Sequence, residues 1–355
     1  MQNPRVPVVG KDGKPRMPTK ASRARRWIKQ GKATPKWNKL GIFYVQLTAD
    51  VGEETQDVVL GLDPGSKFDG VAVVSKREVL QTGMLELPKG IAKKIKQRRQ
   101  QRRFRRHRKC RRRPCRFNNR KRREGWIAPS QKAKVYFRLK IVEELKKLYP
   151  INKAVVEDVR FDHYYKRWGK HFSTVEIGKS KMYNTLRDWF GELKLVEGTE
   201  TARLREKYNA KKSRDKRERS IDSHAIDALV IAADEIGLKK LKAPSFFVWK
   251  RYQYPRRQIH KFRFEKGGIR RREGGSMSLG FKKGDIVLWK GKLARVGGYL
   301  ESKGTISLHT FDVDNKRFTQ NAKPEDCIRL FNQRIMYTTI PLSSKDAELP
   351  CGRRL

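Results

Sequence analysis

The chain has 355 residues, enough for two or three modest domains with a real hydrophobic core. Lysine and arginine number 86 against 37 aspartate and glutamate residues, so the formal net charge is +49 and nucleic acid is the expected neutralising partner. The sequence has no long apolar run, lipidation motif or signal-peptide apolar region, which argues against a membrane partner and predicts a cytoplasmic protein.

The first 50 residues or so are basic. The tetrapeptide PRMP, residues 15–18, precedes a short basic helix expected over residues 21–30. Apolar and aromatic side chains that indicate packing or base stacking follow, namely Trp27, Trp37, Ile42, Phe43 and Tyr44. A small RNA-contacting domain is the favoured interpretation, and a disordered basic arm is the alternative.

The stretch VVLGLDPGSKFDGVAVV, residues 58–74, predicts two apolar strands joined by a turn, with Asp63 at the end of the first. A buried unpaired carboxylate is costly, so Asp63 should meet a cation or a cluster of donors. Asp, Pro and Gly also dominate turns for conformational reasons, so a plain hairpin capped by Asp63 explains the same residues. Residues 78–87 predict a third strand.

The composition changes abruptly between Lys89 and Arg123, where 20 of 35 residues are Lys or Arg and none is acidic. On a helix, this block would present guanidinium groups to phosphates. The expected contacts are Arg98, Arg99, Arg102, Arg103, Arg105 and Arg106. Cys110 and Cys115, with His107 nearby, make a zinc site conceivable, but there is no CxxC pair and reduced thiols are expected.

Two later segments place further carboxylates beside apolar elements. After a helix with apolar positions from Val135 to Tyr149, the strand KAVVEDVRFD runs into Glu157. The segment SIDSHAIDALVIAA, residues 220–233, predicts one helix in which Asp227 is not simply solvated and His224 shares its face. Each of these residues alone is more often structural, but three such coincidences in one chain favour a functional site.

The last third of the chain has a different pattern. Between residues 246 and 272 aromatic and arginine residues alternate, which suits RNA recognition, although a simple amphipathic hairpin remains an alternative. The expected RNA contacts are Arg256, Arg257, Arg270 and Arg271. From Phe281 onward, short strands separated by turn residues predict a small β-barrel.

The motifs LGLDPGS, VVEDVRFD and SHAIDA resemble the three split segments of a RuvC-type nuclease domain. Together with the arginine block they resemble the transposon-encoded IscB and IsrB family, relatives of the CRISPR type II effector. The resemblance implies an α/β, RNase H-like core in which Asp63, Glu157 and Asp227 bind two Mg²⁺ ions, with Mn²⁺ as a possible substitute. His224 would help to activate the water.

Further details place the chain within this resemblance. PRMP resembles the family's PLMP motif with Arg16 in place of Leu, and the arginine block resembles a bridge helix. An HNH insert has no room between Glu157 and His224, which points to the IsrB branch, and the missing CxxC pairs argue against the TnpB branch.

The resemblance implies a division of the chain into seven parts. These are a PLMP-like N-terminal domain (1–54), RuvC segment I (55–88), the bridge helix (89–127), RuvC segment II (128–165), the rest of RuvC with segment III (166–240), an RNA-contacting domain (241–280) and a β-domain that reads the target-adjacent motif (281–355).

The implied function is an RNA-guided nickase that cuts the displaced strand of double-stranded DNA. It would act as a monomer bound to a large structured omega RNA in the prokaryotic cytoplasm. A guide-independent RuvC-like nuclease or transposase would use the same carboxylates, and a catalytically inactive nucleic-acid binder would carry the same charge. An actin-like kinase is disfavoured because no second glycine-rich phosphate loop is present.

Overall fold

The structure is a computed structural model that describes residues 4–88, 96–97, 99–100, 103–104, 123–158, 174–252 and 277–340. The chain forms two compact units, one of Met1–Leu87, Gln131–Arg251 and Tyr337–Leu355, the other of Pro88–Ser130 and Tyr252–Met336. Several residues singled out above lie outside the described residues: Arg98, Arg102, Arg105, Arg106, His107, Cys110, Cys115, Arg256, Arg257, Arg270 and Arg271.

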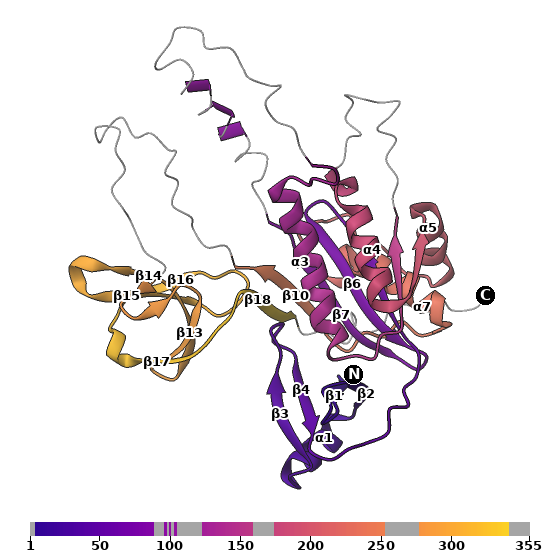
Figure 1. The fold of residues 1–355 in the computed structure, drawn as a ribbon, viewed down its shortest axis with the longest axis horizontal. Helices are drawn as coiled ribbons and strands as arrows, with labels where there is room; N and C mark the ends of the chain where they lie inside the picture. Colours follow the sequence, from indigo (N-terminus) through magenta and orange to yellow (C-terminus); the bar gives the residue numbers. More distant parts are fainter. Residues whose placement is uncertain are drawn as a thin grey trace. The chain divides into compact units, whose positions relative to one another are not determined.

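The N-terminal residues form a four-stranded sheet in the order β2-β1-β4-β3, with one helix packed on it (Figure 1). Its elements are β1 (Val6–Val9), β2 (Pro15–Thr19), α1 (Ala21–Lys29), β3 (Ala33–Trp37) and β4 (Phe43–Leu47). Helix α1 buries Ala24 against Val8 and Val45 of the sheet and keeps its basic residues outside. The PRMP residues are therefore part of a folded sheet, and the disordered-arm alternative is wrong.

The first unit is built on a seven-stranded sheet in the order β18-β10-β7-β6-β5-β8-β9. Its strands are β5 (Val58–Asp63), β6 (Phe68–Ser75), β7 (Val79–Glu86), β8 (Lys153–Glu157), β9 (Glu192–Val196), β10 (Phe246–Arg251) and β18 (Ile335–Ile340). Strands β5, β6 and β7 form an antiparallel meander, whereas β8 runs parallel to β5 and β9 parallel to β8. The central strands are apolar nearly throughout, as expected where both faces of a sheet are covered.

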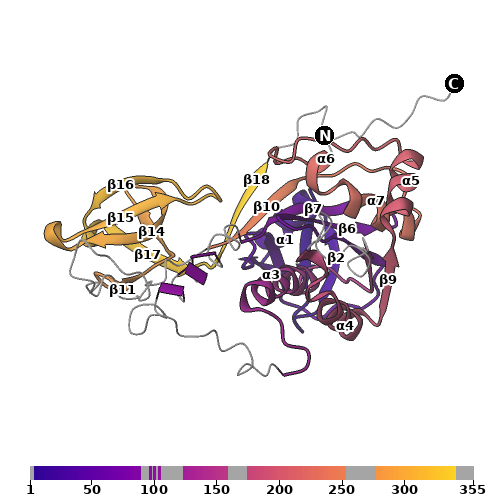
Figure 2. The same ribbon diagram turned by 90° about the horizontal axis from the view of Figure 1, so that it is seen from above.

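Helices cover both faces of this sheet (Figure 2). They are α3 (Pro129–Lys146) and α4 (Lys179–Phe190) on one face, and α5 (Gly198–Lys207), α6 (Ile221–His224) and α7 (Ile226–Ile236) on the other. Helix α7 lies across β5 and β6. A Cβ atom added at Gly61 would lie 1.9 Å from the carbonyl oxygen of Ala228, so α7 approaches the backbone of β5 at the one position without a side chain.

The single helix predicted over residues 220–233 is instead two helices, α6 and α7, separated at Ala225. Ala225 stays in the right-handed helical region, but its φ of −119° departs from regular helix values and interrupts the helix. The backbone of β6 explains the break, because a Cβ at Gly70 would lie 2.2 Å from the carbonyl oxygen of His224. His224 and Asp227 therefore do not share the face of one continuous helix, and the sequence-based expectation on this point is wrong.

The second unit contains a five-stranded antiparallel sheet in the order β16-β15-β14-β13-β17. Its strands are β13 (Asp285–Trp289), β14 (Lys292–Leu300), β15 (Thr305–Thr310), β16 (Arg317–Ala322) and β17 (Cys327–Asn332), preceded by the short pair β11 (Met277–Ser278) and β12 (Phe281–Lys282). Val287, Val296 and Leu308 are at its core. Within the described part of the chain, no helix is long and apolar enough to cross a membrane.

The contact between Gly61 and α7 yields a first prediction. Gly61→Ala should lower the free energy of unfolding by about 3 kcal/mol, because its Cβ would overlap a backbone oxygen that only movement of α7 can relieve. Urea denaturation of the full chain measures the change. Gly52→Ala is the matched control, since nothing lies within 4 Å of its added Cβ. Equal stability of the two variants would contradict the close helix approach.

Candidate metal site at the ends of the central strands

Two of the three predicted carboxylates lie side by side at one edge of the central sheet. Asp63 ends β5 and Glu157 ends β8, and these strands are parallel with Leu62 in register with Val156. The carboxyl ends of parallel strands meet at one edge, so the next residues are neighbours. Because Gly61 faces α7 and side chains alternate along a strand, Asp63 faces α7 as well.

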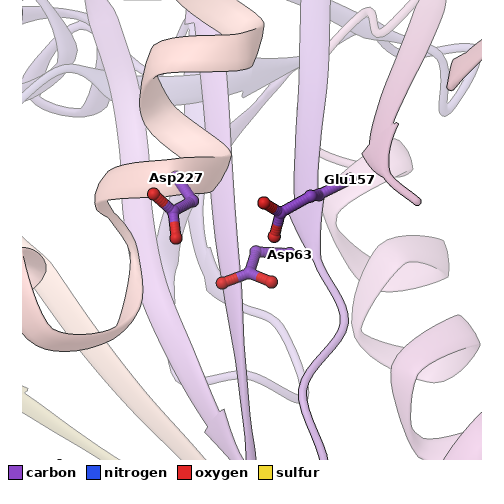
Figure 3. Close-up of side chains that lie close together, drawn as sticks. All are labelled: Asp63, Glu157 and Asp227. Carbon is purple, nitrogen blue, oxygen red and sulfur yellow. The ribbon is translucent and has the colours of Figure 1, made fainter. Parts of the chain in front are cut away.

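The third carboxylate comes from the first turn of α7. Asp227 is 1 % exposed and Glu157 is 7 % exposed, while Asp63 is partly buried. One carboxylate oxygen from each of the three lies within 4.8 Å of the others. Figure 3 shows the three side chains pointing toward one another from two strands and a helix. We call this set of Asp63, Glu157 and Asp227 the carboxylate cluster.

The electrostatics of the carboxylate cluster favour a bound cation. Burial raises the pKa of Asp63 well above its usual value, and the nearby carboxylates of Glu157 and Asp227 raise it further. Like charges gathered away from water are unfavourable unless a cation compensates them. Carboxylate oxygens are hard ligands of the kind that Mg²⁺ takes in proteins, so the donor set of the cluster fits a divalent ion of this class.

Two basic side chains meet the carboxylate cluster at Asp227. Arg205 of α5 donates from Nη1 to Oδ1 of Asp227, and Lys212 donates from Nζ to Oδ2. Lys212 also interacts electrostatically with Asp63 and Glu157. Sequence reasoning missed both residues, because they lie in a segment rich in Lys and Arg where nothing distinguishes a partner of Asp227 from a solvated charge.

A buried ion pair on the opposite face holds the turn that follows Asp63. Arg138 of α3 makes a bidentate ion pair with Asp69, from Nε to Oδ2 at 2.7 Å and from Nη2 to Oδ1 at 2.8 Å. Its Nη2 atom also donates to the carbonyl oxygen of Gly65 at 2.6 Å. Asp69 also accepts a hydrogen bond from the backbone N–H of Gly65 at 2.8 Å, and Lys134 donates to Ser66 O at 2.6 Å. Sequence reasoning singled out neither Asp69 nor its partner Arg138 on α3.

His224 lies next to the turn but is not a member of the carboxylate cluster. Its ring packs against Phe68 with the ring centres 4.4 Å apart, and its Nε2 atom is buried without a hydrogen-bond partner among the described residues. Burial lowers the pKa of His224, so its imidazole is neutral at neutral pH. A neutral imidazole can accept a proton.

Asp158, the neighbour of Glu157, faces the other side of the sheet. Its Oδ1 atom accepts hydrogen bonds from Lys179 Nζ at 2.7 Å and from Tyr183 Oη at 2.9 Å, both on α4. Burial and the hydrogen bond to Asp158 raise the pKa of the Tyr183 phenol. Asp158, directly after β8, therefore links this strand to α4 by hydrogen bonds. Asp158→Ala would leave the buried ammonium of Lys179 with one fewer partner.

The raised pKa of Asp63 predicts a pH-dependent stability. A carboxyl group whose folded pKa lies above its unfolded value stabilises the fold at low pH and loses that contribution as pH rises through the folded pKa. With a chelator present, Asp63→Asn should therefore gain stability over the wild type as pH rises. Each pH unit between the folded and unfolded pKa corresponds to about 1.4 kcal/mol.

Urea denaturation from pH 4 to pH 8 measures this difference. Asp188→Asn is the control, because Asp188 is an exposed carboxylate of α4. A stability difference between Asp63→Asn and the wild type that stays constant over the range would contradict the electrostatic account of the cluster.

Comparisons with known proteins add a family model and two weak structural likenesses. Two structures from Thermus thermophilus are similar over 51 % of this chain and 97 % of theirs: RuvC in complex with a Holliday junction substrate, 14 % identical with a TM-score of 0.28, and RuvC alone, 16 % identical with a TM-score of 0.24. No curated protein matches the chain. The family model described as RRXRR protein matches residues 6–175, just under half of the chain, a span that holds Asp63 and Glu157 and ends before Asp227.

Proposed function

We propose that the chain is an RNA-guided DNA endonuclease of the IsrB type that nicks the displaced strand at the carboxylate cluster. The observation that carries the proposal is the convergence of Asp63, Glu157 and Asp227, whose ligand oxygens lie within 4.8 Å of one another. Phosphodiester hydrolysis by two divalent ions needs such a set of hard ligands. Each of these three ligands comes from one of the three RuvC-like sequence motifs, LGLDPGS, VVEDVRFD and SHAIDA.

The charge of the chain supports a nucleic-acid partner. A formal net charge of +49 favours a polyanionic partner, and a large structured RNA together with double-stranded DNA would supply one. Residues 102–106 have the sequence RRFRR, which fits the pattern RRXRR by which the matching family model is described. They lie within the span that the model matches. Dependence on a target-adjacent motif rests on the resemblance to the IscB and IsrB family.

The residues of the cluster have distinct proposed roles. Asp63, Glu157 and Asp227 would hold Mg²⁺, with Mn²⁺ as an alternative, and the bound ions would supply a nucleophile at neutral pH and stabilise the leaving oxygen. Arg205 orients the carboxylate of Asp227 by a direct ion pair. Arg138 orients the turn after Asp63 through Asp69 and Gly65. His224 would accept a proton from the attacking water, since a base must be unprotonated at the working pH.

Removal of any one carboxylate should stop cleavage. Asp63→Ala, Glu157→Ala and Asp227→Asn should each lower the cleavage rate by at least about 100-fold, beyond the effect of losing an outer-shell partner, while binding to nucleic acid stays nearly intact. Gel assays of cleavage and filter binding measure the two effects. Asp227→Asn is preferred to alanine because its amide oxygen can still accept from Arg205 or Lys212.

The control for Glu157→Ala is Asp158→Asn rather than Asp158→Ala, because Asp158 is bonded to Lys179 and Tyr183 within the fold. Asp158→Asn keeps an acceptor oxygen for both partners and should retain cleavage. Active Glu157→Ala beside inactive Asp158→Asn would mean that the residues of β8 are assigned to the wrong faces.

One cluster predicts one broken strand. The described residues hold a single set of three or more metal-ligating side chains, and one such site performs one hydrolysis at a time. With its RNA, Mg²⁺ and a supercoiled plasmid carrying a matched target beside a randomised flank, the protein should give open-circle product broken in the displaced strand. If cleavage depends on one particular flank sequence, this result would support recognition of the flank by the five-stranded sheet of the second unit.

Four outcomes of the plasmid experiment would contradict this assignment. Linear product at the earliest times would indicate a second cleavage site. A break confined to the guide-paired strand would contradict the strand choice. Cleavage that needs no RNA would favour a guide-independent nuclease or transposase, which would use the same carboxylate cluster. A chain that binds nucleic acid but never cleaves it would be a catalytically inactive binding protein.

A further inference from the structure

Lys212 occupies an unusual position for a lysine in a basic loop. It lies between α5 and α6, and its Nζ atom makes an ion pair with Asp227. Asp63 and Glu157 also interact with it electrostatically. Arg205, the other cation on Asp227, lies on α5 and contacts the opposite carboxylate oxygen. The ammonium of Lys212 therefore interacts with every member of the carboxylate cluster.

The two cations differ in how firmly they are held. The side chain of Lys212 is 41 % exposed and that of Arg205 is 22 % exposed, whereas Asp227 between them is 1 % exposed. Lysine carries its charge on a flexible stem, while arginine presents a planar fork with a preferred geometry. Arg205 projects from a regular helix, but Lys212 belongs to a loop. Lys212 can leave Asp227 for solvent by rotation of its own side chain, without movement of a helix.

A divalent cation bound by the cluster would compete with this ammonium. The oxygen of Asp227 that accepts from Lys212 belongs to the carboxylate that would ligate the metal ion. Two positive charges near one oxygen repel each other strongly in a partly buried site. Metal binding and the Lys212 ion pair should therefore exclude each other, whereas the Arg205 contact uses the other oxygen and can persist.

We propose that Lys212 is the exchangeable counter-ion of the carboxylate cluster: it neutralises Asp227 in the metal-free protein and is displaced when a divalent cation binds. Arg205 keeps Asp227 oriented in both states. This inference rests on the proposed function only in that the carboxylate cluster must be the metal site. It assigns to Lys212 a role in setting metal affinity.

The test is direct titration of the full-length chain, freed of nucleic acid, with Mn²⁺ by isothermal titration calorimetry. Lys212→Met should bind Mn²⁺ roughly tenfold more tightly than the wild type, because the competing cation is gone. Lys212→Gln should behave in the same way, and Lys212→Arg should retain the wild-type affinity. Lys211→Met is the matched control, since Lys211 is the exposed neighbour and its removal changes the net charge equally.

Thermal unfolding gives a second readout that does not depend on cleavage. In a chelator, Lys212→Met should melt below the wild type, because the cluster has lost a cation, and Mn²⁺ should raise its melting temperature more than it raises that of the wild type. Arg205→Met should lower the melting temperature without tightening Mn²⁺ binding, because it loosens Asp227.

The possible failures are distinguishable. If the wild type binds Mn²⁺, Asp63→Ala weakens this binding and Lys212→Met binds no more tightly than Lys211→Met, then the counter-ion role is wrong and the metal site stands. If Asp63→Ala, Glu157→Ala and Asp227→Asn all leave Mn²⁺ binding unchanged, then the cluster is not the metal site, and the proposed function and this inference are both overturned.

Discussion

The site depends on how closely α6 and α7 approach the sheet. Two glycines on neighbouring strands, Gly61 and Gly70, allow backbone to meet backbone, and added Cβ atoms there would lie 1.9 Å and 2.2 Å from carbonyl oxygens. This approach places the first turn of α7 above the ends of β5 and β8, where Asp227 can reach Asp63 and Glu157. The same contact breaks the helix at Ala225, because β6 passes under that residue.

The two faces of the sheet divide the carboxylates between two roles. On the α7 face, Asp63 and Glu157 approach each other and are suited to bind a cation. On the other face, Asp69 and Asp158 are paired with Arg138 and Lys179 of α3 and α4. Strand alternation produces this division for Glu157 and Asp158, which are consecutive. The ion pairs of Asp69 and Asp158 fix the ends of their strands to α3 and α4. Asp63 and Glu157 on the α7 face are not needed for these ion pairs and can therefore bind a ligand.

The sequence predicted the central strands and singled out the three carboxylates that the fold brings together, but it did not predict the partners of these carboxylates. Apolar runs that end in Asp63 and Glu157 and an apolar helix that contains Asp227 are local signals, since a charge amid such residues needs an explanation. The break at Ala225 has no local signal, because no Gly or Pro marks it and β6, a distant part of the sequence, imposes it. Arg205 and Lys212 were equally hidden, since only tertiary packing selects them from a basic segment. Arg16, which stands where the PLMP motif that these residues resemble has Leu, is buried and paired with Asp12, and this pairing also requires the folded sheet.

Exchange at Lys212 would also link metal binding to nucleic-acid binding. While it is paired with Asp227, its ammonium is neutralised and offers little attraction to a phosphate. Once a divalent cation displaces it, the freed ammonium would remain on the loop between α5 and α6, beside the cluster at which the proposed cleavage would place a phosphodiester. A phosphate there would gain the attraction of both the metal ion and the lysine, so each ligand should strengthen the binding of the other. The chain has a net charge of +49, so many of its lysines can bind phosphate whether or not a metal ion is present. Lys212 would differ from them, because it would bind phosphate only when the carboxylate cluster holds a metal ion.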